Sequence, residues 1–289
     1  MLKRYRIYDW WWNRRRHRTP RNDPPRGVLL ISSGGLGDTV LFAHVVERFV
    51  ALAQDNEPVD VLLRSDAMKM AFLLPSNVSA IGVEFERLRR DMVYRREVTD
   101  NLFDTHYRLL VHTDYLRHPD LDEALAAAAQ APDAAAMEPR PWQKYDTLLN
   151  RNRGLYRRLF DSGPPNLNKV LRWSRFTDWL TGTEGPPPVC RLAGDILAPA
   201  ATVDGPVVVI QPFSAVKRKQ SPPALFRRII ESLPPGTRVV MTGAERDLEV
   251  NGDYRPLLEM PGVEFDRSGF ADLVALLRAR MVVHPPQEW

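Results

Sequence analysis

The stretch RGVLLISSGGLGDTVLFAHVVERFVAL, residues 26–52, decides the fold of this chain. Residues 28–31 are an unbroken apolar run between Gly and Ser, too short for a helix, which is typical of a strand buried on both faces. Gly34, Gly35 and Gly37 follow, and from Val40 onward apolar residues recur at helical spacing. The stretch therefore predicts the central strand of a parallel sheet, a glycine loop and a helix in direct succession.

Asp38 lies at the junction between the glycine loop and the helix. The free N–H groups and the positive dipole end of a helix N-terminus favour an anion or a reacting carboxylate at such a place. An aspartate there is equally typical of an N-cap, whose side chain accepts hydrogen bonds from the first turn. The spacing fits neither the G-x-G-x-x-G dinucleotide fingerprint nor a P-loop, which needs Gly-Lys-Ser/Thr.

This opening resembles that of the ADP-heptose:lipopolysaccharide heptosyltransferases, glycosyltransferase family 9, where a strand and a Gly-x-x-Gly-Asp loop begin the first of two Rossmann-like domains. QPFSAVKRKQSPP, residues 211–223, resembles the family segment HPGAS...K-x-W-P-P-x-x-F, with Gln211 in place of His and Ser221 in place of Trp. The positions in matching register are Pro212, Lys219, Pro222, Pro223 and Phe226. The resemblance implies an α/β, GT-B-like fold of two doubly wound domains that face a central cleft, with Asp38 as the catalytic base.

The basic residues 217–219 lie just ahead of a predicted helix start, where ammonium charges and backbone N–H groups together stabilise a diphosphate. The resemblance implies that Lys219 contacts the phosphates of the sugar donor. It also implies that Lys217 belongs to this donor site, with Ser214 or Ala215 lining the same pocket. The alternative is an exposed basic loop.

TGAERD, residues 242–247, resembles a turn that follows the second strand of the donor domain in the family. The resemblance implies that Gly243 and Glu245 belong to the donor site, with Glu245 in contact with the donor nucleoside. The alternative for Glu245 is a charge in the first turn of a helix, where it would interact favourably with the dipole.

ERLRRDMVYRR, residues 86–96, is a dense run of arginines. Such a run is usually a solvated helix face, but arginines also bind phosphate and carboxylate through bidentate hydrogen bonds. The resemblance implies that this region faces an acidic acceptor, so Arg87 and Arg90 are predicted to bind it. His112 and Asp114 follow another apolar run and are further acceptor-side candidates, with a loop histidine as the alternative.

Composition predicts two globular domains and gives no sign of a metal or a cofactor. A chain of 289 residues with 44% hydrophobic and 26% charged residues can bury two cores. It has no apolar run long enough to span a membrane and no secretory signal, and its single cysteine, Cys190, fits a reducing, cytoplasmic compartment. No cluster of His, Cys or Asp has metal-ligand spacing.

Residues 1–25 are predicted to be a basic and aromatic extension outside the core. MLKRYRIYDWWWNRRRHR interleaves Lys and Arg with Tyr and Trp, a mixture suited to the headgroup layer of a membrane. Contact with the inner face of the cytoplasmic membrane is the preferred hypothesis. Nucleic acid, which the same cations would attract, is the less favoured partner, and a disordered tail is the remaining alternative.

The remaining pattern predicts a first domain over residues 26–181, a Pro- and Gly-rich linker over 182–206 and a second domain over 207–289. In the first domain, later strands are expected at 59–63, 78–83 and 107–112, and later helices at 66–74, 121–136, 142–160 and 167–180. In the second, strands are expected at 207–210, 238–241, 263–265 and 281–283, and helices from 222 and over 271–279. The family's Asp-Thr/Ser-Gly-x-x-His loop does not follow the last strand, so the second domain is predicted to be truncated.

The resemblance implies a metal-independent, inverting glycosyltransferase. It would move a heptose-like sugar from an ADP-sugar to a lipopolysaccharide-core or related acidic glycan acceptor, with Asp38 as general base. Two alternatives stay open. One is a non-catalytic relative that binds a nucleotide sugar without turnover, and the other is a basic nucleic-acid-binding protein that acts through its N-terminal tail.

Overall fold

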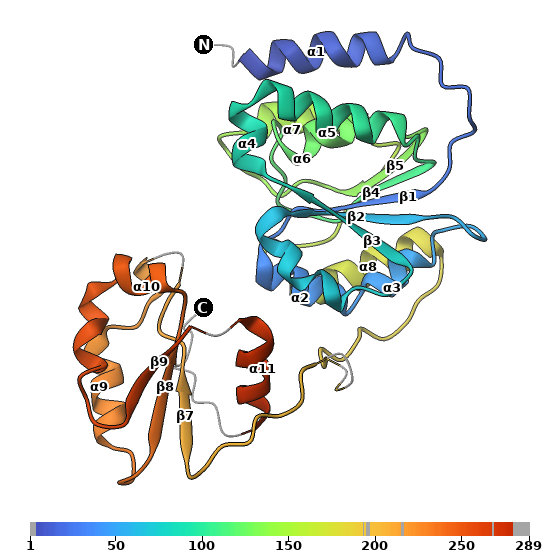
Figure 1. The fold of residues 1–289 in the computed structure, drawn as a ribbon. Coiled ribbons are helices and arrows are strands. Elements are labelled where there is room, and N and C mark those ends of the chain that lie inside the picture. Colours follow the sequence, from blue (N-terminus) through green and yellow to red (C-terminus); the bar gives the residue numbers. More distant parts are fainter. Residues whose placement is uncertain (1–3, 193, 195–196, 215–216, 268, 280–289) are drawn as a thin grey trace. The chain divides into compact units, whose positions relative to one another are not determined.

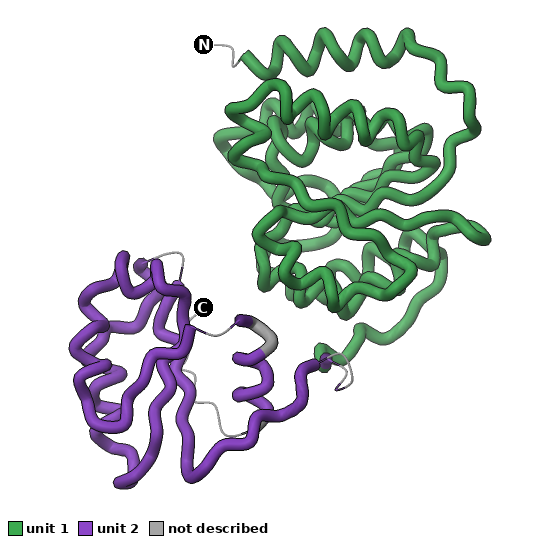
Figure 2. The backbone as a smooth tube through the Cα atoms, viewed as in Figure 1, with its two compact units in different colours: residues 1–191 green, residues 192–289 purple. Residues whose placement is uncertain are grey.

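The computed structural model describes residues 4–192, 194, 197–214, 217–267 and 269–279. The chain divides into two compact units, Met1–Arg191 and Leu192–Trp289 (Figure 2). Each unit has its own parallel sheet and its own hydrophobic core. Within the described part of the chain, no helix combines the length and the apolar character needed to cross a bilayer.

The first unit contains a six-stranded parallel sheet. Its strands are β1 Val28–Ser32, β2 Val59–Arg64, β3 Val78–Val83, β4 Leu109–His112, β5 Asp133–Met137 and β6 Arg158–Phe160. Their order in the sheet is β3-β2-β1-β4-β5-β6, which is that of a doubly wound fold whose switch point lies between β1 and β4. The predicted inner position of β1 is confirmed.

Helices cover both faces of this sheet (Figure 1). One face carries α2 Leu36–Ala43, α3 Val46–Val50, α8 Lys169–Thr181 and the 3-10 helix η1 Ser65–Leu73. The other carries α4 Phe85–Arg90, α5 Met92–Asp104, α6 Asp122–Ala129, α7 Asp146–Asn152 and the 3-10 helix η2 Arg153–Leu155. Val28 and Leu30 of β1 pack in the first layer, Leu29 and Ile31 in the second, and all four are fully buried. The run is apolar without alternation because side chains on both faces of the strand are buried. Burying each of these side chains stabilises the fold by about 1.5–3 kcal/mol.

Two of the predicted helices are wrong in part. The helix expected over residues 121–136 ends at Ala129, because Gln130 adopts a left-handed conformation with φ of 46°, and residues 133–137 form β5 beside β4. In place of the helix expected over 142–160, the structure has the shorter α7. The last three residues of the predicted range, 158–160, form the edge strand β6. In both places, pairing in the sheet outweighs a sequence rich in helix-forming Ala and Leu.

The expectation that residues 1–25 lie outside the core is also wrong, because Arg4–Arg16 form helix α1, which packs on the first unit. Tyr5, Trp12 and Arg16 of this helix are buried. Arg95 donates to Asp9 at 2.7 Å, and Arg16 pairs with Asp100 at 2.7 Å. The three tryptophans and five arginines of the helix concealed this arrangement, since its inward-facing residues include few of the aliphatic side chains that mark a core helix.

The second unit has a three-stranded parallel sheet in the order β7-β8-β9. Its elements are β7 Val207–Ile210, η3 Lys217–Lys219, α9 Pro223–Glu231, β8 Arg238–Thr242, α10 Glu245–Val250, η4 Gly252–Leu257, β9 Val263–Asp266 and α11 Phe270–Ala279. The three predicted strands and both predicted helices among the described residues are confirmed. The strand expected at 281–283 lies outside the described residues, and the described part of 182–206 forms neither helix nor strand.

Candidate functional site

A pocket of about 410 Å³ opens at the carboxyl edge of the first sheet, at the switch point between β1 and β4. In doubly wound folds this edge is where ligands bind. The glycine loop supplies one wall of the pocket, the residues after β4 another and the first turns of α8 a third. The charged lining residues are Asp38, Arg64, Asp114, Arg140, Lys169 and Arg172.

Asp38 is the third residue of α2, and Gly35 is the N-cap. The N–H of Gly35 donates to Oδ2 of Asp38 at 3.1 Å, so the carboxylate reaches back across the loop rather than capping the helix itself. A Cβ on Gly34 would lie 2.5 Å from Cβ of Asp38, which makes glycine obligatory there, whereas a Cβ on Gly35 or Gly37 would meet open space. Gly34 therefore lets the carboxylate of Asp38 fold over the loop. The Asp38 side chain stays 40% exposed.

Lys169, the first residue of α8, bridges the two carboxylates of the pocket. Its Nζ lies 3.0 Å from Oδ1 of Asp38 and 3.9 Å from Oδ1 of Asp114. It also lies 5.0 Å from the ring centroid of Trp173, which is buried and donates its indole N–H to the carbonyl of Thr113 at 2.7 Å. The tryptophan thus fixes α8 against the end of β4 and holds the lysine over the glycine loop.

A buried chain of polar groups continues behind Asp114. Oδ2 of Asp114 accepts hydrogen bonds from the backbone N–H and the hydroxyl of Ser33, and Oγ of Ser33 lies 2.9 Å from Oδ2 of Asp122. Burial raises the pKa of Asp114, and burial together with the charge of Asp114 raises the pKa of Asp122 to about 7. The serine has a single hydroxyl proton, so a protonated Asp122 completes the chain by donating to Ser33, which in turn donates to Asp114.

Asp122→Asn is expected to remove a pH dependence of stability. Between its ordinary pKa of 3.8 and the raised value of about 7, Asp122 binds more protons in the folded chain than in the unfolded one, so stability falls as pH rises through that window. The asparagine amide can take the place of the protonated carboxyl. We expect the variant to match wild type below about pH 4, to be more stable at about pH 8, and to remove a slope of up to about 1.4 kcal/mol per pH unit.

Urea unfolding followed by tryptophan fluorescence at the two pH values measures this difference. Six of the seven tryptophans lie in the first unit, so the signal reports mainly on the part of the chain that contains Asp122. Parallel pH profiles of wild type and variant would contradict the assignment of the proton to Asp122.

His112 does not contact the pocket, so its assignment to the acceptor site is wrong. The residue ends β4 with its side chain fully buried, and its Nδ1 accepts from the backbone N–H of Asp114 at 3.3 Å. Burial lowers the pKa of His112 well below the ordinary value, so the ring is neutral. The histidine shapes the turn that presents Asp114, which is a structural role that the sequence pattern did not distinguish from binding.

Arg87 and Arg90 lie on α4 and do not line this pocket. Arg87 pairs with Asp91 at 3.1 Å and with Glu84 at 3.6 Å, and Arg90 lies 3.5 Å from a carboxylate oxygen of Glu86. This arrangement is that of a charged helix surface. Their assignment to acceptor binding stays a prediction.

The pocket draws its cations from residues that sequence reasoning did not select. Arg64 ends β2, and Lys169 and Arg172 begin α8, where Arg172 is buried against Tyr115 and donates to Oγ of Ser162 at 2.6 Å. The guanidinium of Arg140 is exposed and has no acidic partner within the described ranges. Only Arg64 carries a sequence signal, since it stands at the carboxyl end of a recognisable strand.

The predicted donor residues lie in the second unit. Nζ of Lys217 donates to Oδ1 of Asn251 and forms an ion pair with Oδ1 of Asp253, each at 3.0 Å. Oε2 of Glu245 lies 2.7 Å from Nε of Arg267. Lys219 ends η3 with its side chain exposed and with no acidic partner in the part of the chain described.

Gly243 and Ser214 belong to the same end of this sheet. A Cβ on Gly243 would lie 2.7 Å from the ring of Phe213, so only glycine fits where β8 ends. The backbone carbonyl of Ser214 accepts from the side-chain amide of Gln220 at 2.9 Å. Ala215 lies outside the described residues.

A doubly wound unit with a carboxylate pocket at its switch point, followed along the chain by a second unit with its own parallel sheet, defines a Rossmann-like α/β protein. The structure resembles two of Escherichia coli heptosyltransferase WaaC. The WaaC structure with ADP matches with a TM-score of 0.66 at 18% sequence identity, and the match covers 88% of this chain and 80% of WaaC. The WaaC structure with ADP-2-deoxy-2-fluoro heptose matches with a TM-score of 0.63 at 17% identity, and the match covers 86% of this chain and 78% of WaaC.

Other solved structures share the fold. A glycosyl transferase of family 9 from Veillonella parvula has a TM-score of 0.61 at 13% identity, covering 89% of this chain and 74% of that one. A Listeria monocytogenes protein described as a UDP-N-acetylglucosamine 2-epimerase matches with a TM-score of 0.50 at 11% sequence identity, and the match covers 90% of this chain and 74% of that one. No protein-family model and no curated protein matches the chain. The predicted GT-B-like fold class is confirmed, and because an epimerase shares it, the reaction must be argued from the site.

Proposed function

We propose that this protein is an inverting glycosyltransferase of the heptosyltransferase family. It moves a heptose-like sugar from an ADP-sugar to an acidic glycan acceptor of the lipopolysaccharide-core type. The observation that carries the proposal is the Asp38 carboxylate, which the glycine loop holds half-exposed at the switch point of the first sheet. The WaaC fold, seen with ADP and with a fluorinated ADP-heptose, supports the choice of donor.

In the proposed reaction, an acceptor hydroxyl attacks the anomeric carbon of the donor while its proton passes to Asp38. The new bond forms on the face opposite the departing diphosphate, the carbon–oxygen bond to ADP breaks, and ADP leaves with the electron pair. General base assistance of this kind contributes about 10²–10⁴-fold. Lys219, whose ammonium group is exposed, is proposed to stabilise the charge that grows on the diphosphate.

The cations of the pocket support an anionic acceptor. Arg64, Arg140, Lys169 and Arg172 outnumber the two carboxylates there, and the exposed Arg140 is available to a ligand's carboxylate or phosphate. Lys169 pairs with Asp38 until an anionic acceptor draws the ammonium group away, which would free the carboxylate to take the proton. That pairing is also the observation that favours the alternative, a relative that binds donor without turnover.

Arg140→Ala is expected to raise the KM for an acidic acceptor about 10–100-fold while kcat changes little, because a charged hydrogen bond to the acceptor is lost outside the reacting centre. Steady-state kinetics with acceptor varied at saturating donor measures the two constants separately. Arg157→Ala is the matched control, since Arg157 is an exposed arginine of the same unit that donates to the carbonyl of Pro132. An unchanged KM in Arg140→Ala would remove this residue from the acceptor site.

The full chain, given ADP-heptose and a lipopolysaccharide-core acceptor, tests the proposal through release of ADP and formation of product. Proton NMR of the new glycosidic linkage is expected to show the anomeric configuration opposite to that of the donor. Donor binding without turnover would support the non-catalytic alternative. Retained configuration would rule out the single displacement through Asp38.

A further inference from the structure

Helix α1 presents a face that none of the described elements of the first unit covers. Ile7, Trp10 and Trp11 are 57%, 58% and 50% exposed, so three of the ten exposed large apolar side chains in the described chain lie on this one helix. Their spacing of three to four residues places them on one side, together with the exposed Arg14. Figure 1 shows α1 as the outermost layer of its unit, with no element beyond it.

The opposite side of α1 is fixed to the protein. Tyr5, Trp12 and Arg16 are buried, and Arg6 holds Asp120 through two hydrogen bonds of 2.6 and 2.9 Å. Asp9, the single acidic residue of the helix, faces inward and pairs with Arg95. A helix anchored this firmly by one face does not depend on the exposed parts of the tryptophans for its position, although Trp11 also contacts the buried Trp12 with ring centroids 4.7 Å apart.

The exposed face is electropositive. It carries Arg4, Arg14 and Arg15, and Arg18 follows the helix; none of the four has an acidic partner among the residues described. Arg14 lies 5.6 Å from the ring centroid of Trp10, so cation and aromatic ring form one surface. Tryptophan rings among arginines match the interface of an anionic bilayer, where rings enter the headgroup layer and cations meet phosphate.

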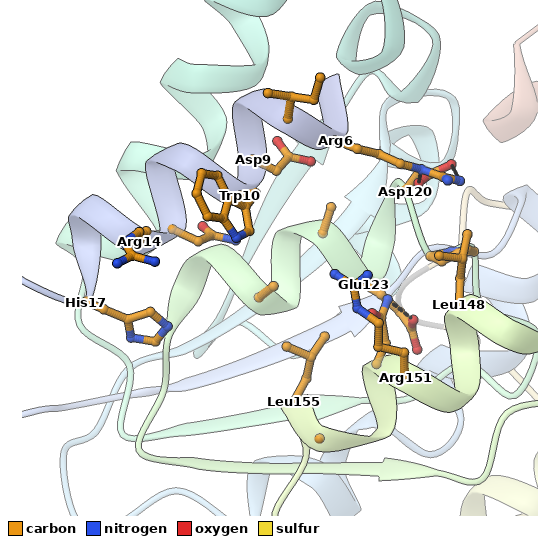
Figure 3. A pocket seen from close by; sticks show the side chains of 17 residues that line it. Arg6, Asp9, Trp10, Arg14, His17, Asp120, Glu123, Leu148, Arg151 and Leu155 are labelled. Atoms are coloured by element: carbon orange, nitrogen blue, oxygen red, sulfur yellow. Dashed lines mark hydrogen bonds and ion pairs between the residues drawn. The ribbon is translucent and has the colours of Figure 1, made fainter. Parts of the chain in front are cut away.

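A groove of about 830 Å³ runs beside α1 and extends this surface. In Figure 3, Trp10 and Arg14 of α1 and His17, which follows this helix, line it on one side, while Arg151 and Leu155 line it from the opposite side. Its acidic lining residues are neutralised, because Asp9 and Asp120 pair with arginines as above, and Glu123 lies 2.8 Å from Nε of Arg117. The groove therefore combines an apolar lining with a net positive rim, which suits the glycerol and upper acyl region of an anionic lipid.

We propose that the outer face of α1 and the adjoining groove bind the surface of an anionic membrane. The face remains a surface contact, since no described helix is long and apolar enough to span the bilayer. The inference does not depend on the reaction at Asp38, although it would bring the pocket close to a lipid-borne acceptor.

Flotation of the full chain with vesicles tests this proposal. We expect binding to equimolar phosphatidylcholine–phosphatidylglycerol vesicles that weakens as salt is raised, and little binding to phosphatidylcholine alone. Arg14→Glu with Arg15→Glu is expected to weaken binding at least about tenfold, since each basic residue near an anionic surface contributes appreciably. Arg227→Glu with Arg228→Glu on α9 is the matched control, because it changes the net charge equally at exposed arginines of the other unit and should bind like wild type.

A second variant separates the aromatic contribution from folding. Trp10→Ala with Trp11→Ala removes two side chains that are at least half exposed and should weaken vesicle binding at least about tenfold while the melting temperature changes little. Brominated lipid should quench the fluorescence of wild type more than that of this variant. Transfer to a water-soluble acceptor fragment should proceed equally in both α1 variants, which separates this proposal from the proposed reaction.

Three results would overturn the membrane assignment. The first is an absence of binding to anionic vesicles at low salt, and the second is binding that both α1 variants retain. The third is RNA or DNA displacing the vesicles and binding more tightly through the same arginines, because the face would then serve nucleic acid.

Discussion

Asp38→Asn is expected to lower kcat for sugar transfer by about 10²–10⁴-fold, with a much smaller change in the affinity for donor. The amide keeps the size of the carboxylate, and its oxygen can still accept the hydrogen bond from the N–H of Gly35. What it cannot do is take a proton from the acceptor hydroxyl. Release of ADP under saturating donor and acceptor measures the loss, and isothermal titration with ADP measures the binding that should remain.

Glu47→Gln provides the control for this substitution. Glu47 is an exposed carboxylate in the first turn of α3, in the same helical layer as Asp38, so its change removes one negative charge from the same layer without touching the pocket. We expect wild-type turnover from the control and an unchanged melting temperature from both variants. Transfer by Asp38→Asn at the rate of wild type would remove the base assignment and, with it, the proposed mechanism.

The strand, glycine loop and helix of the first unit could be predicted because each is specified by local residues. The apolar run of β1 is buried on both faces, and Gly34 is required by direct contact with Asp38. The position of the pocket follows from the same pattern, since the residues that end a strand next to the switch point meet at one edge of the sheet. Local sequence therefore located Asp38 and its pocket.

The partners of Asp38 could not be predicted, because they come from distant parts of the chain. Trp173, one turn further along α8, donates a hydrogen bond to the carbonyl of Thr113 and so fixes the helix against the end of β4. In that position Lys169 reaches the carboxylate of Asp38. His112 and Asp114, two residues apart at the end of one strand, differ completely in role, since the histidine turns inward and the aspartate lines the pocket. Such differences arise from packing between elements, which a linear pattern does not record.

Arg117→Met is expected to destabilise the first unit by about 3–5 kcal/mol, because it leaves a buried carboxylate without its counter-charge. Nε of Arg117 lies 2.8 Å from Oε1 of Glu123, and both side chains are completely buried. The guanidinium also donates to the carbonyl of Met137, the last residue of β5, while the other oxygen of Glu123 accepts from Asn152 at 2.8 Å. The pair thus joins the residues after β4 to the end of β5, to α6 and to α7.

Urea unfolding followed by tryptophan fluorescence measures this cost. The double variant Arg117→Met with Glu123→Met is expected to recover most of the loss, because an apolar pair of similar volume needs no charge compensation. Arg153→Met, which breaks the Arg153–Glu138 pair at the surface of the same unit, should cost no more than about 1 kcal/mol. If Arg117→Met unfolds at the same urea concentration as this surface variant, the Arg117–Glu123 pair does not hold the layer together, and the tethering of α6 and α7 to the sheet must rest on their apolar contacts alone.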